Sequence, residues 1–421
     1  MSMKRGSTKM AILLATSVLS VFCLVSTELC RADSAEVLPR GVWRVGLDNK
    51  FYFPTGKRFD PDGHTEDAAV DFNTNLNRRA FPALALVEKF FGMLPGSATL
   101  GRSIVDFEYR FNILEFGLEY GITDRLSVGL LVPYWWVENQ VDARIDSATA
   151  TVGKNPFLNA IVPLNMPGTV PLTTADVIRL LGPGLDINGD GRVDIPGYDY
   201  KRFGSFSGDG FSDVEAGFRY QYLLTDRWRL AVTAGMRFPT GEVDDPDNLT
   251  DFGRGDGVFA PLFRLNNDFI GVKNLILNAT FRYDLLLPDT KTLRVLEDVN
   301  QPLSRIKERV DRDVGDVFEF EGSAKYEFFK GFTGAVLYKY GFKLKDDMQG
   351  ENGHSLPSLE AETDSTEHVY MVGVSYSTLP LYQEKKFPLP LSFSLTFRDR
   401  FAGSNNVLKS KYLAFSVRAY F

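Results

Sequence analysis

Apolar and polar residues alternate along most of the chain with a period of two. In "ILEFGLEYGITDRLSVGLLVPYWW" (residues 113–136), Leu114, Phe116 and Leu118 alternate with charged or small residues, and the alternation resumes after residues 123–125. Because successive side chains of a β-strand point to opposite faces, this pattern predicts a hairpin with one apolar face. The pattern returns at residues 222–230, where "YGITDRLSV" becomes "YLLTDRWRL".

Twelve segments show this alternation. They are residues 43–53, 114–120, 126–136, 216–220, 228–236, 259–265, 275–285, 318–328, 332–342, 370–376, 391–397 and 413–421. Short connections, at 123–125, 225–227, 267–274, 330–331 and 379–388, alternate with others at 54–103, 138–212, 239–256, 288–314, 345–366 and 402–406, all long except the last. This arrangement predicts an all-β fold: a transmembrane antiparallel up-and-down β-barrel of about 12 strands with long extracellular loops.

A soluble β-sandwich shows similar alternation, and the aromatic residues distinguish the two folds. Aromatic side chains mark the ends of the apolar faces, as in the interfacial girdles of membrane barrels. They are Tyr120, Tyr134, Trp135, Trp136, Trp228 and Phe238. The final strand, "YLAFSVRAYF", ends in Phe421 and resembles the C-terminal signature that barrel-assembly machinery recognises. We therefore expect outer-membrane lipid and this machinery as partners.

The N-terminal residues predict export. Lys4, Arg5 and Lys9 precede an apolar run from Met10 to Val25, which is shorter than the roughly 20 residues that span a bilayer as a helix. We expect a signal peptide at residues 1–32 and a mature barrel at 33–421. Both cysteines lie in the signal peptide, so disulfide and thiol chemistry are excluded from the mature chain. The net charge of −7 gives no indication of nucleic acid as a partner.

Two of the predicted hairpins resemble those of the outer-membrane family named for a putative meta-pathway of phenol degradation. The resemblance lies in "YGITDRLSVGLLVPY" and "YLLTDRWRLAVTAGMRFPTGE", in which two strands flank a T-D-R turn and P-T-G follows the second pair; another P-T-G stands at residues 54–56. It implies a barrel that passes small, often aromatic, hydrophobic compounds, and it supplies no substrate residues. We therefore expect a channel of the cell outer membrane for passive uptake of small hydrophobic or aromatic solutes.

The residues between the apolar positions are expected to line the barrel interior, and many are charged. They are Glu115, Glu119, Glu215, Arg219, Arg229, Arg237, Arg282, Asp284, Glu319, Glu321, Lys325, Lys339, Arg398, Arg400 and Arg418. Twelve strands fall between filled eight-stranded barrels and open sixteen-stranded porins, so two interpretations stay open. The charges line a passage that selects solutes by size and field, or they form an ion-pair network that supports the wall.

The stretch "DINGDGRVD" (186–194), in the longest predicted outer loop (138–212), resembles a calcium loop. Its candidate ligands are the side chains of Asp186, Asn188, Asp190 and Asp194 and the carbonyl group of Arg192. Ca²⁺ prefers six to eight oxygen ligands, but Gly197 stands where such a loop has a bidentate acid. We expect weak calcium binding with a structural role; the alternative is an ordinary Asp/Asn/Gly-rich turn. A short helix is predicted at 174–181 in the same loop.

The chain carries no clear enzyme signature. A barrel phospholipase needs a His-x-Ser-Asn-Gly run, in which histidine activates serine, and this chain has only His64, His354 and His368. His354 precedes Ser355 in a polar loop, and His368 has no serine at strand spacing. We therefore predict that the protein is not an enzyme. The second functional class is a non-transporting structural or surface-binding barrel with a closed lumen and calcium-ordered loops.

Overall fold

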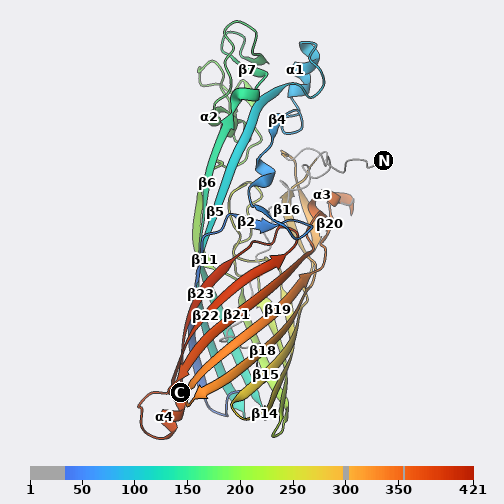
Figure 1. The fold of residues 1–421 in the computed structure, drawn as a ribbon. Coiled ribbons are helices and arrows are strands. Elements are labelled where there is room, and N and C mark those ends of the chain that lie inside the picture. Colours follow the sequence, from blue (N-terminus) through green and yellow to red (C-terminus); the bar gives the residue numbers. More distant parts are fainter. Residues whose placement is uncertain (1–33, 297–302, 354–355) are drawn as a thin grey trace, which may run out of the picture.

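The computed structural model describes residues 34–296, 303–353 and 356–421, so the predicted signal peptide lies outside the described residues. The chain forms a closed antiparallel barrel from which one hairpin extends far beyond the rim (Figure 1). The twelve barrel strands are β1 (Trp43–Tyr52), β5 (Thr99–Thr123), β6 (Leu126–Asp146), β12 (Val214–Leu224), β13 (Trp228–Phe238), β14 (Ala260–Val272), β15 (Leu275–Asp284), β18 (Val317–Phe329), β19 (Phe332–Lys343), β21 (Ser365–Ser377), β22 (Leu391–Gly403) and β23 (Lys411–Tyr420). All twelve predicted strands are confirmed.

The first and last strands close the barrel. β1 pairs with β23 on one side and with β5 on the other, so that Val45 lies opposite both Ala419 and Leu118. The ring continues through consecutive antiparallel pairs to β12, which pairs with β6, and β6 pairs with β5. A closed sheet has no edge, so its backbone amides and carbonyls find partners within it, as a hydrocarbon environment requires.

Short turns join the strands at the end of the barrel opposite the extended hairpin (Figure 1). The predicted turns at 123–125, 225–227 and 330–331 are confirmed. β14 runs to Val272, so the turn predicted at 267–274 is in fact the pair Lys273 and Asn274, with Asn274 at a φ of 63°. The connection after β21 contains the short helix α4 (Leu379–Gln383).

The extended hairpin consists of the outer parts of β5 and β6, which are 25 and 21 residues long. These strands include residues 99–103 and 138–146, which were predicted to be loop; that prediction was wrong, because both stretches continue the paired strands. The two strands stay paired from Thr123–Leu126 at the inner turn to Arg102–Asp146 at the outer end. One continuous hairpin therefore links the barrel wall to the outer elements.

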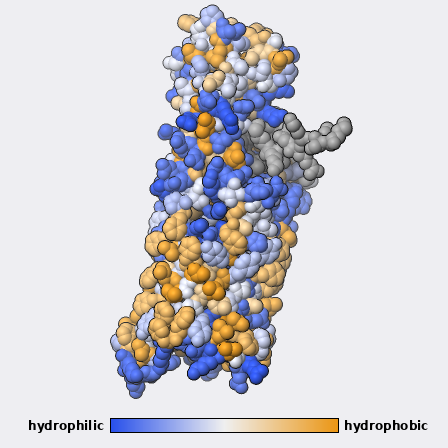
Figure 2. Space-filling view, viewed as in Figure 1, coloured by the Kyte–Doolittle hydropathy of each residue, from blue (hydrophilic) through white to orange (hydrophobic). Residues whose placement is uncertain are grey.

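The polarity of this hairpin reverses between Asn112 and Leu114. Below that level the outward Phe116 is exposed and the inward Glu115 is buried, as in a barrel surrounded by lipid. Above it most outward residues are polar, as at Asp106, and the inward Phe107 is buried, as in a protein surrounded by water. The reversal marks the outer boundary of the membrane, and Figure 2 shows the apolar surface gathered over the lower barrel.

Aromatic residues lie along both boundaries. At the inner end Trp43 contacts Tyr120, and Trp228 contacts Phe269, with ring centroids 4.5 and 4.9 Å apart. At the outer end the aromatic set includes Tyr134, Trp136, Phe211, Phe238 and Phe259. Trp135, predicted to belong to the girdle, is 3% exposed and faces inward, whereas its neighbour Trp136 is 41% exposed. Adjacent residues of a strand face opposite sides, so the two neighbouring tryptophans cannot both belong to the girdle.

Short elements fill the outer connections. They are β2 (Lys57–Phe59), β3 (Thr65–Asp67), η1 (Val70–Phe72), β4 (Asn75–Asn77), α1 (Leu84–Phe90), η2 (Ser147–Thr149), β7 (Val152–Asn155), β8 (Ala160–Pro163), α2 (Thr174–Leu181), β9 (Gly184–Leu185), β10 (Ile195–Pro196), β11 (Phe206–Phe211), β16 (Asp289–Arg294), β17 (Lys307–Asp313), β20 (Asp347–Gln349), η3 (Glu351–Gly353) and α3 (Pro357–Glu360). The helix predicted at 174–181 is confirmed as α2, which begins with a capping box of Thr173 and Asp176. Among the described residues, no helix is long and apolar enough to cross a membrane.

The reversal predicts where an added charge is costly. Leu130 and Gln140 lie on the outward face of β6, below and above the boundary. Leu130→Arg should lower the free energy of unfolding by about 2–4 kcal/mol, because it places a guanidinium in hydrocarbon. Gln140→Arg should change it by no more than about 0.5 kcal/mol. Denaturant titration of the refolded protein in phospholipid vesicles measures both, and equal effects would refute this boundary.

Candidate functional site

The inner face of the barrel carries charged residues on nearly every strand. We call their ion-paired set the charge ring. It comprises Asp48, Lys50, Glu115, Glu215, Arg237, Arg264, Arg282, Asp284, Glu319, Lys339, Glu367, Arg398, Arg400 and Arg418. Strand alternation places them inward, because their neighbours in sequence face lipid.

One part of the ring joins β12, β13 and β15. The guanidinium of Arg237 lies 3.0 Å from the Glu215 carboxylate and 2.7 Å from Asp284. Arg282 lies 2.6 Å from the same Asp284 and 3.5 Å from Glu215. Glu215 and Asp284 therefore each have at least two cations beside them, and Arg237 and Arg282 each have at least two carboxylates.

The ring continues from β18 to β22 around Glu367. Glu319 lies 4.0 Å from Arg282 and 3.5 Å from Lys339, so it connects the two parts. Glu367 lies 2.5 Å from the Lys339 ammonium and 2.7 Å from the Arg400 guanidinium. Arg398, at 3.8 Å, is a third cation beside this carboxylate.

Two further pairs lie on β1 and its neighbouring strands. Lys50 donates to Glu115 of β5 at 2.5 Å, and Arg418 of β23 lies 3.4 Å from Asp48. These groups are shielded from water: Glu115 is 2% exposed, Glu319 is 1% exposed and Glu367 is 0% exposed. Their burial and close pairing agree with the interpretation of these inward charges as an ion-pair network.

Other predicted lumen residues lie below the ring, nearer the short turns. Glu119 pairs with Arg44, and Arg219 donates to the Thr233 hydroxyl at 3.1 Å. Arg229 lies 3.3 Å from Asp268. Glu321 and Lys325 are half-buried on β18. The prediction of these residues as inward-facing agrees with their register, but they do not belong to the ring.

The N-terminal segment, residues 34–40, enters the inner end of the barrel. The Ser34 hydroxyl donates to Asp268 at 2.7 Å, and the Gln221 amide donates to the Ala35 carbonyl at 2.8 Å. Glu36 lies 3.3 Å from Arg229, and the Leu38 amide donates to Ser127. This segment gave no alternating pattern in the sequence, so its position was not predicted.

A cavity of about 120 Å³ lies between the charge ring and this segment; we call it the inner cavity. Its wall includes inward glycines on four neighbouring strands: Gly117, Gly129, Gly217 and Gly235. Gly217 and Gly235 lie opposite each other so closely that a Cβ on either would meet a backbone oxygen at 2.7 Å. The glycines leave room beside the wall that side chains occupy elsewhere.

Above the ring the inner face of the hairpin is aromatic. Tyr109 and Phe111 stack with centroids 6.1 Å apart, and Phe252 packs against Phe111 at 4.8 Å. Phe252 belongs to the β13–β14 loop, in which burial and the neighbouring Asp251 raise the pKa of Asp244 to about 8. A raised pKa favours the protonated folded form, so the loop loses stability as pH rises through about 8. The loop covers the outer side of the lumen.

The calcium-like loop lies between β9 and β10 and is closed by its own hydrogen bonds. The Asp186 carboxylate accepts from the amides of Gly189 and Gly191, at 2.6 and 2.8 Å, and the Gly191 amide lowers the pKa of Asp186. Asp194 accepts from the Ile187 amide at 2.7 Å. These bonds orient carboxylates around the loop without testing whether calcium binds, so the ligand set stays a prediction.

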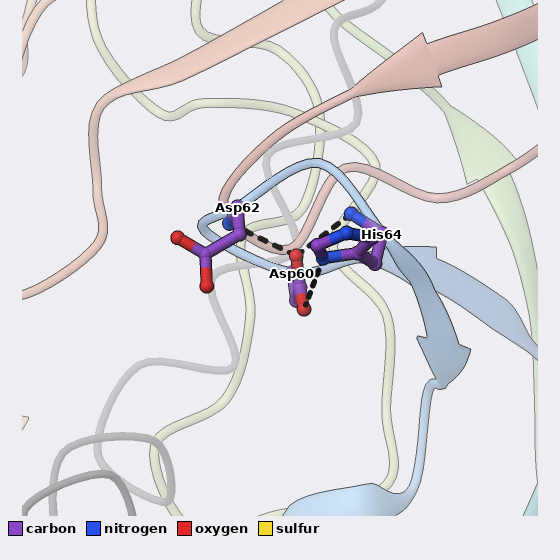
Figure 3. A group of neighbouring side chains, drawn as sticks. All are labelled: Asp60, Asp62 and His64. Atoms are coloured by element: carbon purple, nitrogen blue, oxygen red, sulfur yellow. Dashed lines mark hydrogen bonds and ion pairs between the residues drawn. The ribbon is translucent and has the colours of Figure 1, made fainter. Parts of the chain in front are cut away.

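A different acidic group has its ligand atoms close together. Within the described residues, Asp60, Asp62 and His64 form the one group of at least three Asp, Glu, His or Cys side chains with ligand atoms within 4.8 Å (Figure 3). The Asp60 carboxylate accepts from the backbone amides of Asp62 and His64, at 2.9 and 2.8 Å. These bonds stabilise the turn between β2 and β3 and account for the arrangement.

The two histidines that the structure describes have structural surroundings. His368 faces outward on β21, where its Nδ1 lies 2.7 Å from the Tyr338 hydroxyl and its ring lies 4.9 Å from Tyr340. His64 belongs to the turn beside Asp60. His354 lies outside the described residues. His368 thus belongs to the aromatic outer boundary.

Comparison with known proteins gives a family match and a fold match. A family model described as "Putative MetA-pathway of phenol degradation" matches residues 98–383. No curated protein sequence matches the chain. The crystal structure of an outer-membrane channel from Pseudomonas putida F1 is 11% identical, with a TM-score of 0.52, and the alignment covers 94% of this chain and 100% of that one. That likeness shows the fold.

Two further structures are less similar. The P. putida toluene transporter TodX is 12% identical over 91% of this chain and 90% of its own, with a TM-score of 0.33. A Pseudomonas aeruginosa FadL homologue is 11% identical over 91% and 90%, also with a TM-score of 0.33. These values are too low to support an inference about this chain.

The charge ring makes a prediction about stability. Glu367→Gln should lower the free energy of unfolding by about 3–5 kcal/mol, because it leaves Lys339, Arg398 and Arg400 buried without their carboxylate. Glu108→Gln, which alters a partly exposed carboxylate on β5 above the membrane, should change it by less than about 0.5 kcal/mol. Denaturant titration compares the two variants. An unchanged midpoint and slope for Glu367→Gln would contradict the assigned role of Glu367.

Proposed function

Because the chain belongs to the family described as "Putative MetA-pathway of phenol degradation", we propose that it is an outer-membrane channel that admits small hydrophobic or aromatic molecules by diffusion. The chief support is the apolar inner face of the extended hairpin. This face starts outside the membrane and ends at the pair Ile113 and Trp135, directly above the Glu115 level of the ring. The apolar interior of the part outside the membrane therefore reaches down to the level of the charge ring without a break.

The proposed route runs from this apolar face through the charge ring and the inner cavity to the periplasmic end. The carboxylates of the ring are buried among their cations, so we expect passage to require some of these ion pairs to separate. Pairs between neighbouring strands can exchange partners, because Glu215, Asp284 and Glu367 each lie beside more than one cation. Toluene, a small aromatic hydrocarbon, belongs to the proposed solute class and serves as the first test solute.

The burial of the ring also favours a second candidate, a structural or surface-binding barrel with a permanently closed lumen. A buried ion-pair network can stabilise a rigid barrel wall as well as it can form a gate. The two candidates differ in solute flux, so uptake separates them. Intact cells suit this assay better than phospholipid vesicles, because apolar solutes cross phospholipid without a protein.

Uptake of labelled toluene at low concentration should be faster in cells that produce the protein than in cells that lack it. Gly117→Leu fills the inner cavity, where a Cβ meets only a Leu131 methyl at 3.9 Å, and should lower the rate at least tenfold. Gly322→Leu is the matched control, because Gly322 faces outward and has nothing within 4 Å. Wild-type uptake equal to that of cells without the protein would support the structural barrel.

We also propose that calcium orders the loop at 186–194. Oxygen ligands suit Ca²⁺, and the support is the arrangement of Asp186, Asn188, Asp190 and Asp194 around one tight turn with Gly189 and Gly191 at positive φ. The loop with calcium bound would hold α2 and β9 beside the extended hairpin. Calcium would be a structural ion outside the membrane, with no part in transport.

Calorimetry tests the calcium proposal. Wild-type protein should give a binding heat with a dissociation constant of roughly 10⁻⁴–10⁻³ M, as in other extracellular modules, and Asp190→Ala should abolish it. Asp62→Ala should leave it unchanged and so exclude the group at Asp60. Identical heats for wild type and Asp190→Ala would discard the proposal.

The last strand bears on assembly, and we propose that barrel-assembly machinery recognises β23. Phe421 exchanges two backbone hydrogen bonds of 2.9 Å with Trp43, and its side chain is exposed. Leu413 and Phe415 are exposed on the outward face of the same strand. This exposed apolar edge would be available before β1 pairs with it.

A further inference from the structure

A cavity lined by apolar side chains lies in the outer part of the molecule, well above the charge ring; we call it the outer cavity. Its volume is about 80 Å³. Segments far apart in the sequence meet there: Phe72, Val105 of β5, Ile145 of β6, Ile178 of α2, Phe203 and Leu249. Because the inward face of the hairpin is apolar only above the membrane, this cavity could not form inside the lipid-surrounded barrel.

Aromatic rings form one wall of the outer cavity. Phe72 lies 5.5 Å from Phe203 and 5.1 Å from Phe107, measured between ring centroids, and the Phe107 contact is edge to face. Rings in these arrangements prefer other rings at the same spacing. The wall thus offers an aromatic molecule the same contacts that the side chains make with one another.

The polar groups around the cavity already have partners. The Ser103 hydroxyl donates to the Phe72 carbonyl at 2.5 Å, and the Thr174 hydroxyl accepts from the Ile145 amide at 3.1 Å. Asp71 pairs with Arg58, although burial raises the pKa of this carboxyl. A bound hydroxyl would compete with these bonds or stay unsatisfied, which weakens its binding. The surroundings favour a hydrocarbon over a phenol.

We propose that the outer cavity is a binding site for a single-ring aromatic hydrocarbon, from which the molecule enters the channel. An engineered cavity of about 150 Å³ binds benzene. At about 80 Å³ this cavity is smaller, so one ring fits only when side chains such as Ile178 move aside. Larger or fused rings do not fit. The role as an entry site rests on the proposed function, but binding itself does not.

A series of packed aromatic side chains runs from Phe72 in the cavity wall toward the charge ring, beginning with its neighbour Phe107. From Phe107 the contacts pass to Tyr109 at 5.9 Å and then to Phe111. Phe111 lies 5.7 Å from Tyr52, which lies 4.9 Å from Tyr412. Arg398 of the charge ring lies over the Tyr412 ring. A molecule leaving the cavity inward therefore meets apolar and aromatic surface until it reaches the ring.

Site-specific NMR tests binding, because bulk methods also count toluene dissolved in detergent or lipid. In full-length protein with labelled isoleucine methyl groups, toluene should shift the Ile145 and Ile178 signals in a saturable way. Ile104, on the outward face of β5, should show only a small linear change. Phenol should bind at least tenfold more weakly than toluene. Saturable binding of phenol with equal affinity would overturn the assignment of a hydrocarbon site.

Variants that fill the cavity complete the test. Ala143→Leu adds three carbons to the cavity wall and should weaken toluene binding at least tenfold; Ile178→Phe fills it from α2 and serves if the first variant does not fold. Ala148→Leu makes the same change at an exposed position of η2 and should have no effect. Unchanged binding by a folded cavity-filling variant would refute the site.

Uptake separates this inference from the proposed function. If the site feeds the channel, Ala143→Leu should lower toluene uptake at low concentration and leave the maximal rate unchanged. Toluene binding without any wild-type uptake would refute the channel and leave the binding site standing. Wild-type uptake with no saturable shift at Ile145 would refute the binding site and leave the channel standing.

Discussion

The Glu367 carboxylate shows the constraint on which the barrel depends. It is fully buried and lies beside Lys339, Arg398 and Arg400. A charge removed from water is tolerated only with opposite charges next to it. Lys339 belongs to β19, and Arg398 and Arg400 belong to β22, so the cations come from the two strands that flank Glu367 on β21. The strands must therefore keep one register, since a shift of one residue would turn every charge toward lipid. The ion pairs inside the barrel and the lipid outside it both require the same register between the strands.

The same constraint divides the molecule into layers with different properties. The outer layer has an aromatic interior and a polar exterior; the charge ring follows; the inner cavity and the N-terminal segment complete the lumen. An apolar solute gains most from the first layer and least from the second. Control over passage therefore lies at the level of Glu115, where aromatic side chains end and ion pairs begin.

Much of this arrangement was predictable from the sequence, because strands in a membrane barrel show their period directly. The twelve strands, most inner turns and α2 followed from local pattern. The outer parts of β5 and β6 did not, although Val105, Phe107, Tyr109 and Phe111 alternate clearly with polar residues; the apolar face there is the inward one. The sequence identified charged inward positions but not their partners, which depend on register between strands. The N-terminal segment and the outer cavity join residues distant in sequence and left no local signal.

The length of the hairpin also sets how far the protein reaches from the cell. Thirteen residues of β5 separate Asn112 from Thr99, and at about 3.3 Å per residue they extend for roughly 40 Å along the strand. The outermost elements, α1 among them (Figure 1), therefore stand well outside the hydrocarbon core. Whatever approaches the cell from the medium, whether solute, antibody or phage, meets the extended hairpin before it meets the membrane.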